Sequence, residues 1–234
     1  MKLFTKSLER AFLDLTDPLV TWLLNNRVRP NAITTVGALL VVISAVALGL
    51  GWIRLGGAIL LFSGIVDTLD GQVARRGGMV SKFGAFYDST LDRVGDGVTF
   101  IGIAAYLLSL PHLQYPVFTA VACMIAVLSS LLVSYARARA EGLGVDCKVG
   151  LVQRAERLLA IGAPAVIVGP GANGIVLQVI VILLAALSTI TVIQRFVYVY
   201  QVTSGSGVRL PSSPIIETQI RTVQGQTVPP DERT

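Results

Sequence analysis

Charged residues are scarce in this chain of 234 residues. They make up 14% of the sequence, whereas soluble domains carry about 25%. Hydrophobic residues account for 53%, and the mean hydropathy is +0.71. This composition excludes an ordinary soluble domain and indicates a membrane protein. A membrane-spanning helix needs about 20 apolar residues, so the apolar stretch over 32–202 has room for six spans with short connections.

Cysteine is almost absent as well. The two cysteines, Cys123 in an apolar segment and Cys147 in a polar loop, provide no disulfide framework and fit a reducing or membrane setting. The first residues contain no short apolar core followed by a small-residue cleavage site, so we expect the mature chain to begin at or near Met1. The net charge of +5 comes from basic residues at the ends of apolar segments, without interleaved aromatic residues, which argues against a nucleic-acid partner.

Long apolar runs, by contrast, are abundant. They predict spans at 32–53, 55–76, 83–110, 115–140, 154–168 and 175–202. Residues 1–29 form an N-terminal connector with apolar side chains at helical spacing, which predicts an amphipathic helix lying on the membrane surface: Phe4, Leu8, Phe12, Leu15 and Leu19. We therefore expect an all-α integral membrane protein in which an interfacial amphipathic helix precedes six transmembrane helices over 30–203. The Ser-, Gly- and Pro-containing segment 204–234 is expected to be a mobile polar tail.

The distribution of basic residues predicts the orientation. With these six spans, only Arg54 lies in a loop on the far side of the membrane. The positive-inside rule then places both termini and the polar loops in the cytoplasm, as expected for a multi-pass protein of the plasma membrane. The alternative is that one short span is re-entrant, which would move the tail to the other side.

Five aspartates interrupt the second and third expected spans. Each carboxylate costs roughly 2.5 to 3.5 kcal/mol there, so the group needs a compensating partner. Spacings of three and four residues place two aspartates on one face of each helix, where four carboxylates can converge. Such oxygen ligands suit Mg²⁺ or Mn²⁺, and two ions can clamp a phosphate. The residues are Asp67, Asp70, Asp88, Asp92 and, one turn further on, Asp96.

The residues between these aspartates favour binding of a diphosphate. Gly71 and Ala74 leave little side-chain bulk beside Asp70, so a flat base or a diphosphate can approach the helix. Arg75 adds a bidentate donor for phosphate oxygens, and Gly84 gives similar clearance on the facing helix. The alternative is that the small residues serve close helix packing and that the basic pair beginning at Arg75 marks a cytoplasmic helix end.

This pattern resembles the signature of the CDP-alcohol phosphotransferases without departure. The resemblance extends to the layout of six spans after a surface helix, and to the Pro-Asn-x-x-Thr sequence that opens the first span at Pro30, Asn31 and Thr34. The signature residues are Asp67, Asp70, Gly71, Ala74, Arg75, Gly84, Asp88 and Asp92.

The resemblance implies an enzyme that moves a phosphatidyl-like group from a CDP-linked lipid to a small alcohol and releases CMP. It further implies two divalent ions, Mg²⁺ or Mn²⁺, on Asp67, Asp70, Asp88 and Asp92, with Asp92 also acting as general base. Homodimers are common in this family, so a dimer is expected. Asp96 lies outside the signature, and we expect it to pair helices or join a polar network. The CDP group is expected to bind near Asn31, Thr34, Asp67, Asp70, Gly71, Ala74, Arg75 and Gly84.

A cluster of arginines indicates which kind of alcohol acts as the acceptor. Arg195 interrupts an apolar segment in which an unpaired arginine is costly. If the spans bundle, it could converge with other arginines on the phosphate of an acceptor. This part resembles the subgroup that makes phosphatidylinositol phosphate from inositol phosphate and CDP-diacylglycerol, although Arg137 stands where lysine is frequent and Ala155 where proline is. The expected acceptor-phosphate residues are Arg137, Arg154, Arg157 and Arg195.

Several alternatives remain at this point. Arg137, Arg139 and Arg154 could be positive-inside anchors, or could pair with Glu141 and Glu156. Glycerol phosphate would use the same kind of acceptor site. Membrane prenyltransferases also bind a diphosphate through aspartates, but they need no Gly71, Ala74 and Arg75 set. A transporter would distribute its carboxylates across the bilayer, whereas these lie towards the cytoplasmic ends of two adjacent spans.

Overall fold

The computed structural model describes residues 6–205, and every regular element in that range is a helix. The expected tail falls almost entirely outside the described residues. The predicted spans correspond to α2 through α7, each within a few residues of the expected bounds. The elements are α1 (Lys6–Asn25), α2 (Pro30–Gly49), α3 (Ile53–Arg76), α4 (Lys82–Ser109), α5 (Pro116–Gly142), α6 (Arg154–Ile167), the short 3₁₀ turn η1 (Ala172–Gly174) and α7 (Ile175–Gly205).

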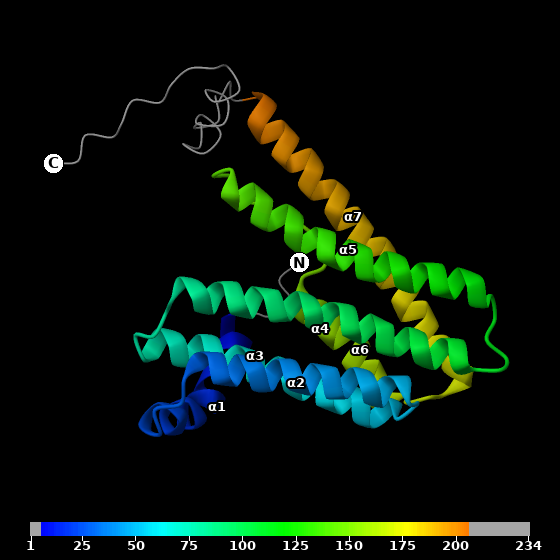
Figure 1. The fold of residues 1–234 in the computed structure, drawn as a ribbon, viewed down its shortest axis with the longest axis horizontal. Coiled ribbons are helices and arrows are strands. Elements are labelled where there is room, and N and C mark those ends of the chain that lie inside the picture. Colours follow the sequence, from blue (N-terminus) through cyan, green and yellow to red (C-terminus); the bar gives the residue numbers. More distant parts are fainter. Residues whose placement is uncertain (1–5, 206–234) are drawn as a thin grey trace, which may run out of the picture.

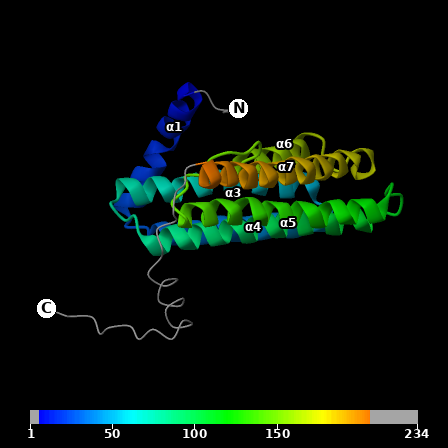
Figure 2. The ribbon, with the colours of Figure 1, turned by 90° about the horizontal axis from the view of Figure 1, so that it is seen from above.

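Helices α2 to α7 run lengthwise beside one another, and α1 crosses one end of this bundle (Figures 1 and 2). Helix α2 packs against α3 and α4, α5 packs against α4 and α7, and α6 packs against α3. The main apolar core lies among these helices and includes Phe100, Ile103 and Leu107 of α4. The end of α3 and the start of α4 lie at the end of the bundle near α1 (Figures 1 and 2).

Three described helices are long and apolar enough to cross a membrane: Pro30–Gly49, Pro116–Gly142 and Ile175–Ser204. Helices α3, α4 and α6 do not meet this criterion, because of their charges or their length. Helices α3 and α4 carry the aspartates and several basic residues, and α6 has only 14 residues, which span about 21 Å at 1.5 Å per residue. The chain is therefore an all-helical membrane protein with at least three apolar spans.

The helix starts follow local sequence signals. Pro30 and Pro116 occupy the first positions of α2 and α5, where proline costs no hydrogen bond. The Ser81 hydroxyl accepts the Gly84 amide at the start of α4. At α6, Gln153 and Glu156 form a reciprocal capping box. These caps determine where the helices that carry the candidate site residues begin.

Two glycines let neighbouring helices approach the site-bearing helices closely. A Cβ atom on Gly102 of α4 would lie 2.2 Å from the carbonyl oxygen of Ala45 in α2. A Cβ atom on Gly57 of α3 would lie 2.6 Å from the Cβ of Ala165 and 3.0 Å from the carbonyl oxygen of Gly162, both in α6. Any larger residue would push these helices apart. Glycine at these positions therefore sets the spacing of α2, α3, α4 and α6.

Helix α1 is attached to the end of α3 by polar contacts. Arg76 forms an ion pair with Asp17, and Gln72 and Thr16 share a hydrogen bond. Apolar side chains of α1, including Leu15 and Leu19, are exposed. The expected apolar residues Phe4, Leu8 and Phe12 belong to the part of the chain whose side chains are not described. The observed helix and its uncovered apolar residues are compatible with a position at the membrane surface.

Candidate functional site

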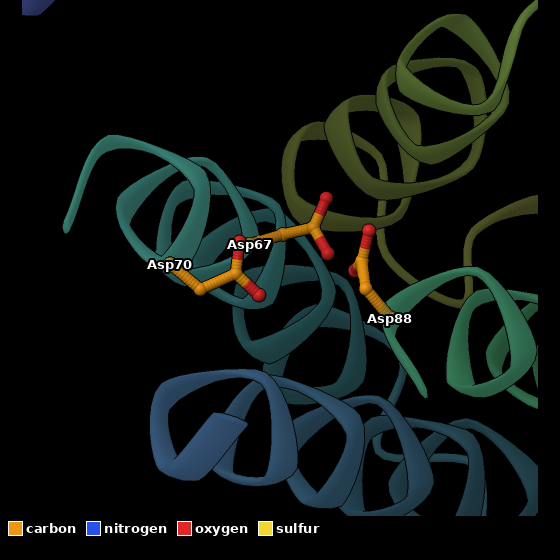
Figure 3. A group of neighbouring side chains, drawn as sticks. All are labelled: Asp67, Asp70 and Asp88. Carbon is orange, nitrogen blue, oxygen red and sulfur yellow. The ribbon is translucent and has the colours of Figure 1, made fainter. Parts of the chain in front are cut away.

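Three aspartates converge between α3 and α4. Asp67 and Asp70 lie on α3, and Asp88 lies on α4. One carboxylate oxygen of each lies within 4.8 Å of the others. Figure 3 shows Asp67 and Asp88 pointing toward one another, with Asp70 beside them. The predicted convergence of carboxylates from these two helices is thus observed for three of the four signature aspartates.

Asp70 is oriented by α2. The Thr34 hydroxyl donates a hydrogen bond of 2.6 Å to Oδ2 of Asp70, and it also contacts the carbonyl oxygen of Pro30 at 3.1 Å. Both Asp70 and Thr34 are buried. One oxygen of Asp70 is therefore held by Thr34, which directs the carboxylate toward the other aspartates. A further link between α2 and α4, the 3.0 Å hydrogen bond between Thr35 and Tyr87, had no signal in the sequence.

Asp92 stands beside the group of three and shares an arginine with it. Nη1 of Arg154 lies 2.6 Å from Oδ2 of Asp67 and 2.8 Å from Oδ1 of Asp92. Arg154 is the first residue of α6, so α6 brings a positive charge across the gap between α3 and α4. Among the described residues, it is the only cation that forms an ion pair with any of the four signature aspartates.

This donor set fits a divalent cation. Four carboxylates against one contacting guanidinium leave an excess of negative charge in a bundle of mainly apolar helices, and such charge is costly without a partner. Carboxylate oxygens are the ligands that Mg²⁺ and Mn²⁺ prefer. The three converging oxygens of Asp67, Asp70 and Asp88 are the residues that would hold an ion.

The residues expected near a nucleotide surround the same end of α3. The guanidinium of Arg75 folds over Gly71, since a Cβ atom there would lie 3.1 Å from Nη1 of Arg75. Across the gap, a Cβ atom on Gly84 would lie 3.3 Å from Oδ1 of Asn31. Ala74 is half-buried one turn beyond Asp70. Residues of α2, α3 and α4 thus together form one border of the aspartate cluster.

The four acceptor arginines lie on α5, α6 and α7. Arg137 is exposed and forms an ion pair of 2.8 Å with Glu141, one of the alternatives left open by the sequence. Arg195 is buried and donates to the backbone carbonyl oxygens of Val149, at 2.9 Å, and of Val133. Arg195 of α7 is therefore held by α5 and by the segment between α5 and α6.

Arg157 has a different environment. It is 3% exposed and forms an ion pair with Asp96, which is 7% exposed. The expectation that Asp96 pairs helices is confirmed. Nε and Nη1 of Arg157 have no hydrogen-bond partner among the described residues, and each such buried donor costs about 1–3 kcal/mol. Arg157 is therefore enclosed in the bundle.

Glu156 does not pair with these arginines. Its carboxylate accepts the backbone amide of Gln153 at 2.9 Å as part of the capping box. The cap was not recognised in the sequence, although the spacing of Gln153 and Glu156 is its signal. Its effect on the site is indirect, because it determines where α6 begins and hence where Arg154 lies.

The chain matches the family model described as CDP-alcohol phosphatidyltransferase over residues 27–200. This range contains all the helices from α2 to α6 and most of α7. The chain belongs to the CDP-alcohol phosphatidyltransferase family and is a transferase. The family membership inferred from the signature is confirmed.

Two curated relatives show which members of the family this chain is similar to. An archaetidylinositol phosphate synthase of Methanothermobacter thermautotrophicus is 41% identical over 170 residues, covering 72% of this chain and 82% of that protein. A phosphatidylinositol phosphate synthase of Cutibacterium acnes is 35% identical over 191 residues, covering 78% of this chain and 91% of that protein. The predicted resemblance to the inositol phosphate subgroup is therefore confirmed.

A solved structure shares the fold. The phosphatidylinositol phosphate synthase of Mycobacterium tuberculosis with CDP-DAG bound superimposes with a TM-score of 0.71 at 31% identity, covering 80% of this chain and 94% of that one. Another structure of the same enzyme is in complex with manganese and citrate, with a TM-score of 0.71 and 31% identity over 79% of this chain and 88% of that one. A manganese-binding relative agrees with the aspartate cluster described above.

Proposed function

We propose that this enzyme transfers a phosphatidyl group from CDP-diacylglycerol to inositol phosphate and releases CMP, a step of phospholipid biosynthesis. The observation that carries the proposal is the cluster of three carboxylates with Arg154 of α6 beside it. An acceptor that already carries a phosphate needs such a second anion site. The two curated relatives have different lipid groups in their names but share inositol phosphate, which supports the acceptor more strongly than the donor.

The donor occupies the end of α3. The CDP group lies against Gly71 and Ala74, where little side-chain bulk blocks it, and Arg75 holds the diphosphate with its guanidinium. Asn31, Thr34 and Gly84 complete this subsite together with the signature aspartates. Two divalent ions, Mg²⁺ or Mn²⁺, held by Asp67, Asp70, Asp88 and Asp92 supply stabilisation of the negative charge on the phosphates.

An apolar groove supports a lipid donor. It has a volume of about 300 Å³ and its lining is wholly apolar. Leu69 of the lining is adjacent in sequence to Asp70, and Val66 is adjacent to Asp67, so the groove begins beside the carboxylates. A hydrocarbon chain of the donor fits this groove between α1, α2 and α3. The other lining residues are Leu19, Leu23, Val28, Ala32, Ile33, Val36, Phe62 and Ile65.

Asp92 is the general base. It takes the proton from the acceptor hydroxyl, whose oxygen attacks the β-phosphorus; the bond from that phosphorus to the CMP oxygen then breaks, and CMP leaves with the electron pair. Asp92 lies outside the group of three converging carboxylates, which suits a residue that must receive a proton. Its contact with Arg154 supports a position between the proposed donor and acceptor subsites.

The acceptor phosphate binds to Arg137, Arg154 and Arg195. Arg154 joins this subsite to the base, because the same guanidinium contacts Asp92. Arg157, which was expected among the direct ligands, is enclosed by the bundle and contributes through its charge. Glycerol phosphate is the alternative acceptor, since its phosphate would use the same arginines.

The membrane arrangement forms part of this proposal. Helices α2 to α7 make six transmembrane spans in the plasma membrane, with α1 of the 1–29 connector at the interface and 204–234 as a polar tail. Both termini and the active site face the cytoplasm, from which a soluble inositol phosphate arrives. The enzyme works as a homodimer.

The reaction is tested by CMP release from purified protein in detergent with Mn²⁺ or Mg²⁺. CDP-diacylglycerol or a CDP-linked ether lipid serves as donor, and inositol phosphate, inositol, glycerol phosphate or serine serves as acceptor. We expect metal-dependent release with inositol phosphate alone. Release with glycerol phosphate alone would replace the proposed acceptor, and a strict preference for the ether lipid would replace the donor. No metal-dependent release with any pair would contradict the proposed function.

Replacement of Arg195 by glutamine tests the acceptor subsite. A hydrogen bond to a charged group contributes about 1.5–3 kcal/mol, so Arg195→Gln should raise the KM for inositol phosphate roughly tenfold to a hundredfold. The KM for the CDP-lipid should stay close to that of the unchanged enzyme. Arg139→Gln is the matched control, because Arg139 is an exposed arginine of α5. An unchanged acceptor KM in Arg195→Gln, at an unchanged melting temperature, would remove Arg195 from the subsite.

A further inference from the structure

Two arginines of α6 contact two aspartates of α4 at matching spacing. Arg154 and Arg157 are three residues apart, and Asp92 and Asp96 are four apart, so each pair is about one turn apart on its own helix. Arg154 lies 2.8 Å from Asp92, and Arg157 contacts Asp96. The two ion pairs form successive links between the same two helices.

These links join helices that otherwise pack on different neighbours. Helix α6 packs against α3 and α7, and α4 packs against α2 and α5. Within the described chain, α4 and α6 make no helix–helix contact of comparable extent. The long arginine side chains bridge this separation. Close packing against α3 holds α6 in the bundle, and the two ion pairs add its direct links to α4.

The ion pair between Arg157 and Asp96 contributes little to the stability of the fold. Arg157 and Asp96 are almost completely buried, and removing two charges from water offsets most of their attraction. Nε and Nη1 of Arg157 have no partner in the described part of the chain, which weakens the pair further. Its most evident consequence is geometric, because a bond between charged groups in an apolar interior permits only one register of the two helices.

We propose that Asp96 and Arg157 are positioning residues whose ion pair holds α6 in the register at which Arg154 reaches Asp67 and Asp92. Its kinetic consequence rests on the proposed function, in which Arg154 binds the acceptor phosphate beside the base. A shift of about 1 Å in such a site costs roughly a hundredfold in rate. The placement of Arg154 against Asp67 can also be measured without any acceptor.

The main test variant is Asp96→Leu/Arg157→Met, which removes both charges and keeps the approximate side-chain volumes. Replacing a buried ion pair by apolar residues is often neutral or stabilising, so this protein is expected to fold. The affinity for Mn²⁺ is measured by electron paramagnetic resonance titration of the purified protein in detergent. Arg154→Gln is the reference, since its guanidinium contacts two of the carboxylates and opposes binding of a cation there.

Arg154→Gln should lower the Mn²⁺ dissociation constant about tenfold, because a like charge is removed from the site. The double variant should lower it in the same direction, since Arg154 no longer stays on Asp67 and Asp92. It should also raise the KM for inositol phosphate about tenfold while the KM for the CDP-lipid changes little. Arg139→Gln removes an arginine that is exposed and forms no ion pair among the described residues, and should leave Mn²⁺ binding unchanged.

A folded double variant with the Mn²⁺ affinity and acceptor KM of the unchanged enzyme would overturn the proposal. If the double variant does not fold, Arg157→Lys replaces it, because lysine keeps the charge but loses the planar fork of the guanidinium. An intermediate shift in Mn²⁺ affinity then supports the positioning role, and an unchanged affinity contradicts it. If inositol phosphate is not the acceptor, the unchanged enzyme will show no turnover with it. The comparison of Mn²⁺ affinities does not depend on the acceptor, so the two failures can be told apart.

Discussion

Asp92→Asn should lower CMP release by about 10²- to 10⁴-fold, the range that a positioned general base contributes. An asparagine side chain has nearly the same shape as aspartate but cannot accept the proton of the acceptor hydroxyl. Asp67, Asp70 and Asp88, whose oxygens converge within 4.8 Å, are untouched by the change. Binding of Mn²⁺ and of the CDP-lipid should therefore remain measurable, and the loss should appear in kcat.

Asp146→Asn provides the control for this variant. Asp146 is an exposed carboxylate in the segment between α5 and α6, where it pairs with Lys148. Its replacement should leave turnover close to that of the unchanged enzyme. If Asp92→Asn retained most of its kcat, the proton would have to be taken by another group, and the role of Asp92 as base would be wrong. A loss of Mn²⁺ binding in Asp92→Asn would instead indicate that its main contribution is to hold the ion.

Gly102→Ala should destabilise the protein by roughly 3 kcal/mol, at the upper end of the usual cost of overpacking. The added Cβ would lie 2.2 Å from the carbonyl oxygen of Ala45 and 2.9 Å from its carbonyl carbon. These are backbone atoms of α2, which cannot move aside as a flexible side chain can, so the two helices must separate. A cost of this size corresponds to a fall of about 6–12 °C in the melting temperature of a chain of this length, which thermal unfolding in detergent would measure.

Gly97→Ala is the matched control on the same helix. A Cβ atom on Gly97 meets nothing within 4 Å among the described residues. Alanine is favoured over glycine inside a helix by about 1 kcal/mol, so this variant should melt at the same temperature or higher. If both alanine variants melted alike, close packing of α2 on α4 would not explain the glycine at position 102. A shift of α2 in Gly102→Ala would also affect the site, because Thr34 of α2 donates a hydrogen bond to Asp70.

The helices and most of the candidate site could be predicted from local sequence. Apolar runs and the caps at Pro30, Pro116 and Ser81 determine where helices begin, because these signals act within a few residues. The signature spacing placed Asp67 and Asp70 on one helical face and Asp88 on a facing helix. The structure brings these three together as expected.

The interaction partners of the four arginines could not be predicted from the sequence. Arg137, Arg154 and Arg157 look alike as basic residues at or near the ends of apolar segments, and Arg195 interrupts such a segment. In the structure Arg137 pairs with Glu141 in its own helix, Arg154 bridges two aspartates, and Arg157 is enclosed with Asp96. Arg195 binds backbone carbonyls of two other segments. Which partner each arginine takes depends on how far α6 and α7 slide and rotate against their neighbours, and no local pattern records this.

The sequence by itself thus determined the class of protein, the approximate helix boundaries and the aspartates that converge, since hydropathy, capping and spacing along one helix are local properties. The tertiary structure decided the contact of Thr34 with Asp70, the bridge of Arg154 between Asp67 and Asp92, and the burial of Arg157. These contacts join residues 36 to 87 positions apart. They arise only when glycines such as Gly57 and Gly102 allow whole helices to approach, because the position of a helix in a bundle is set by packing over its full length.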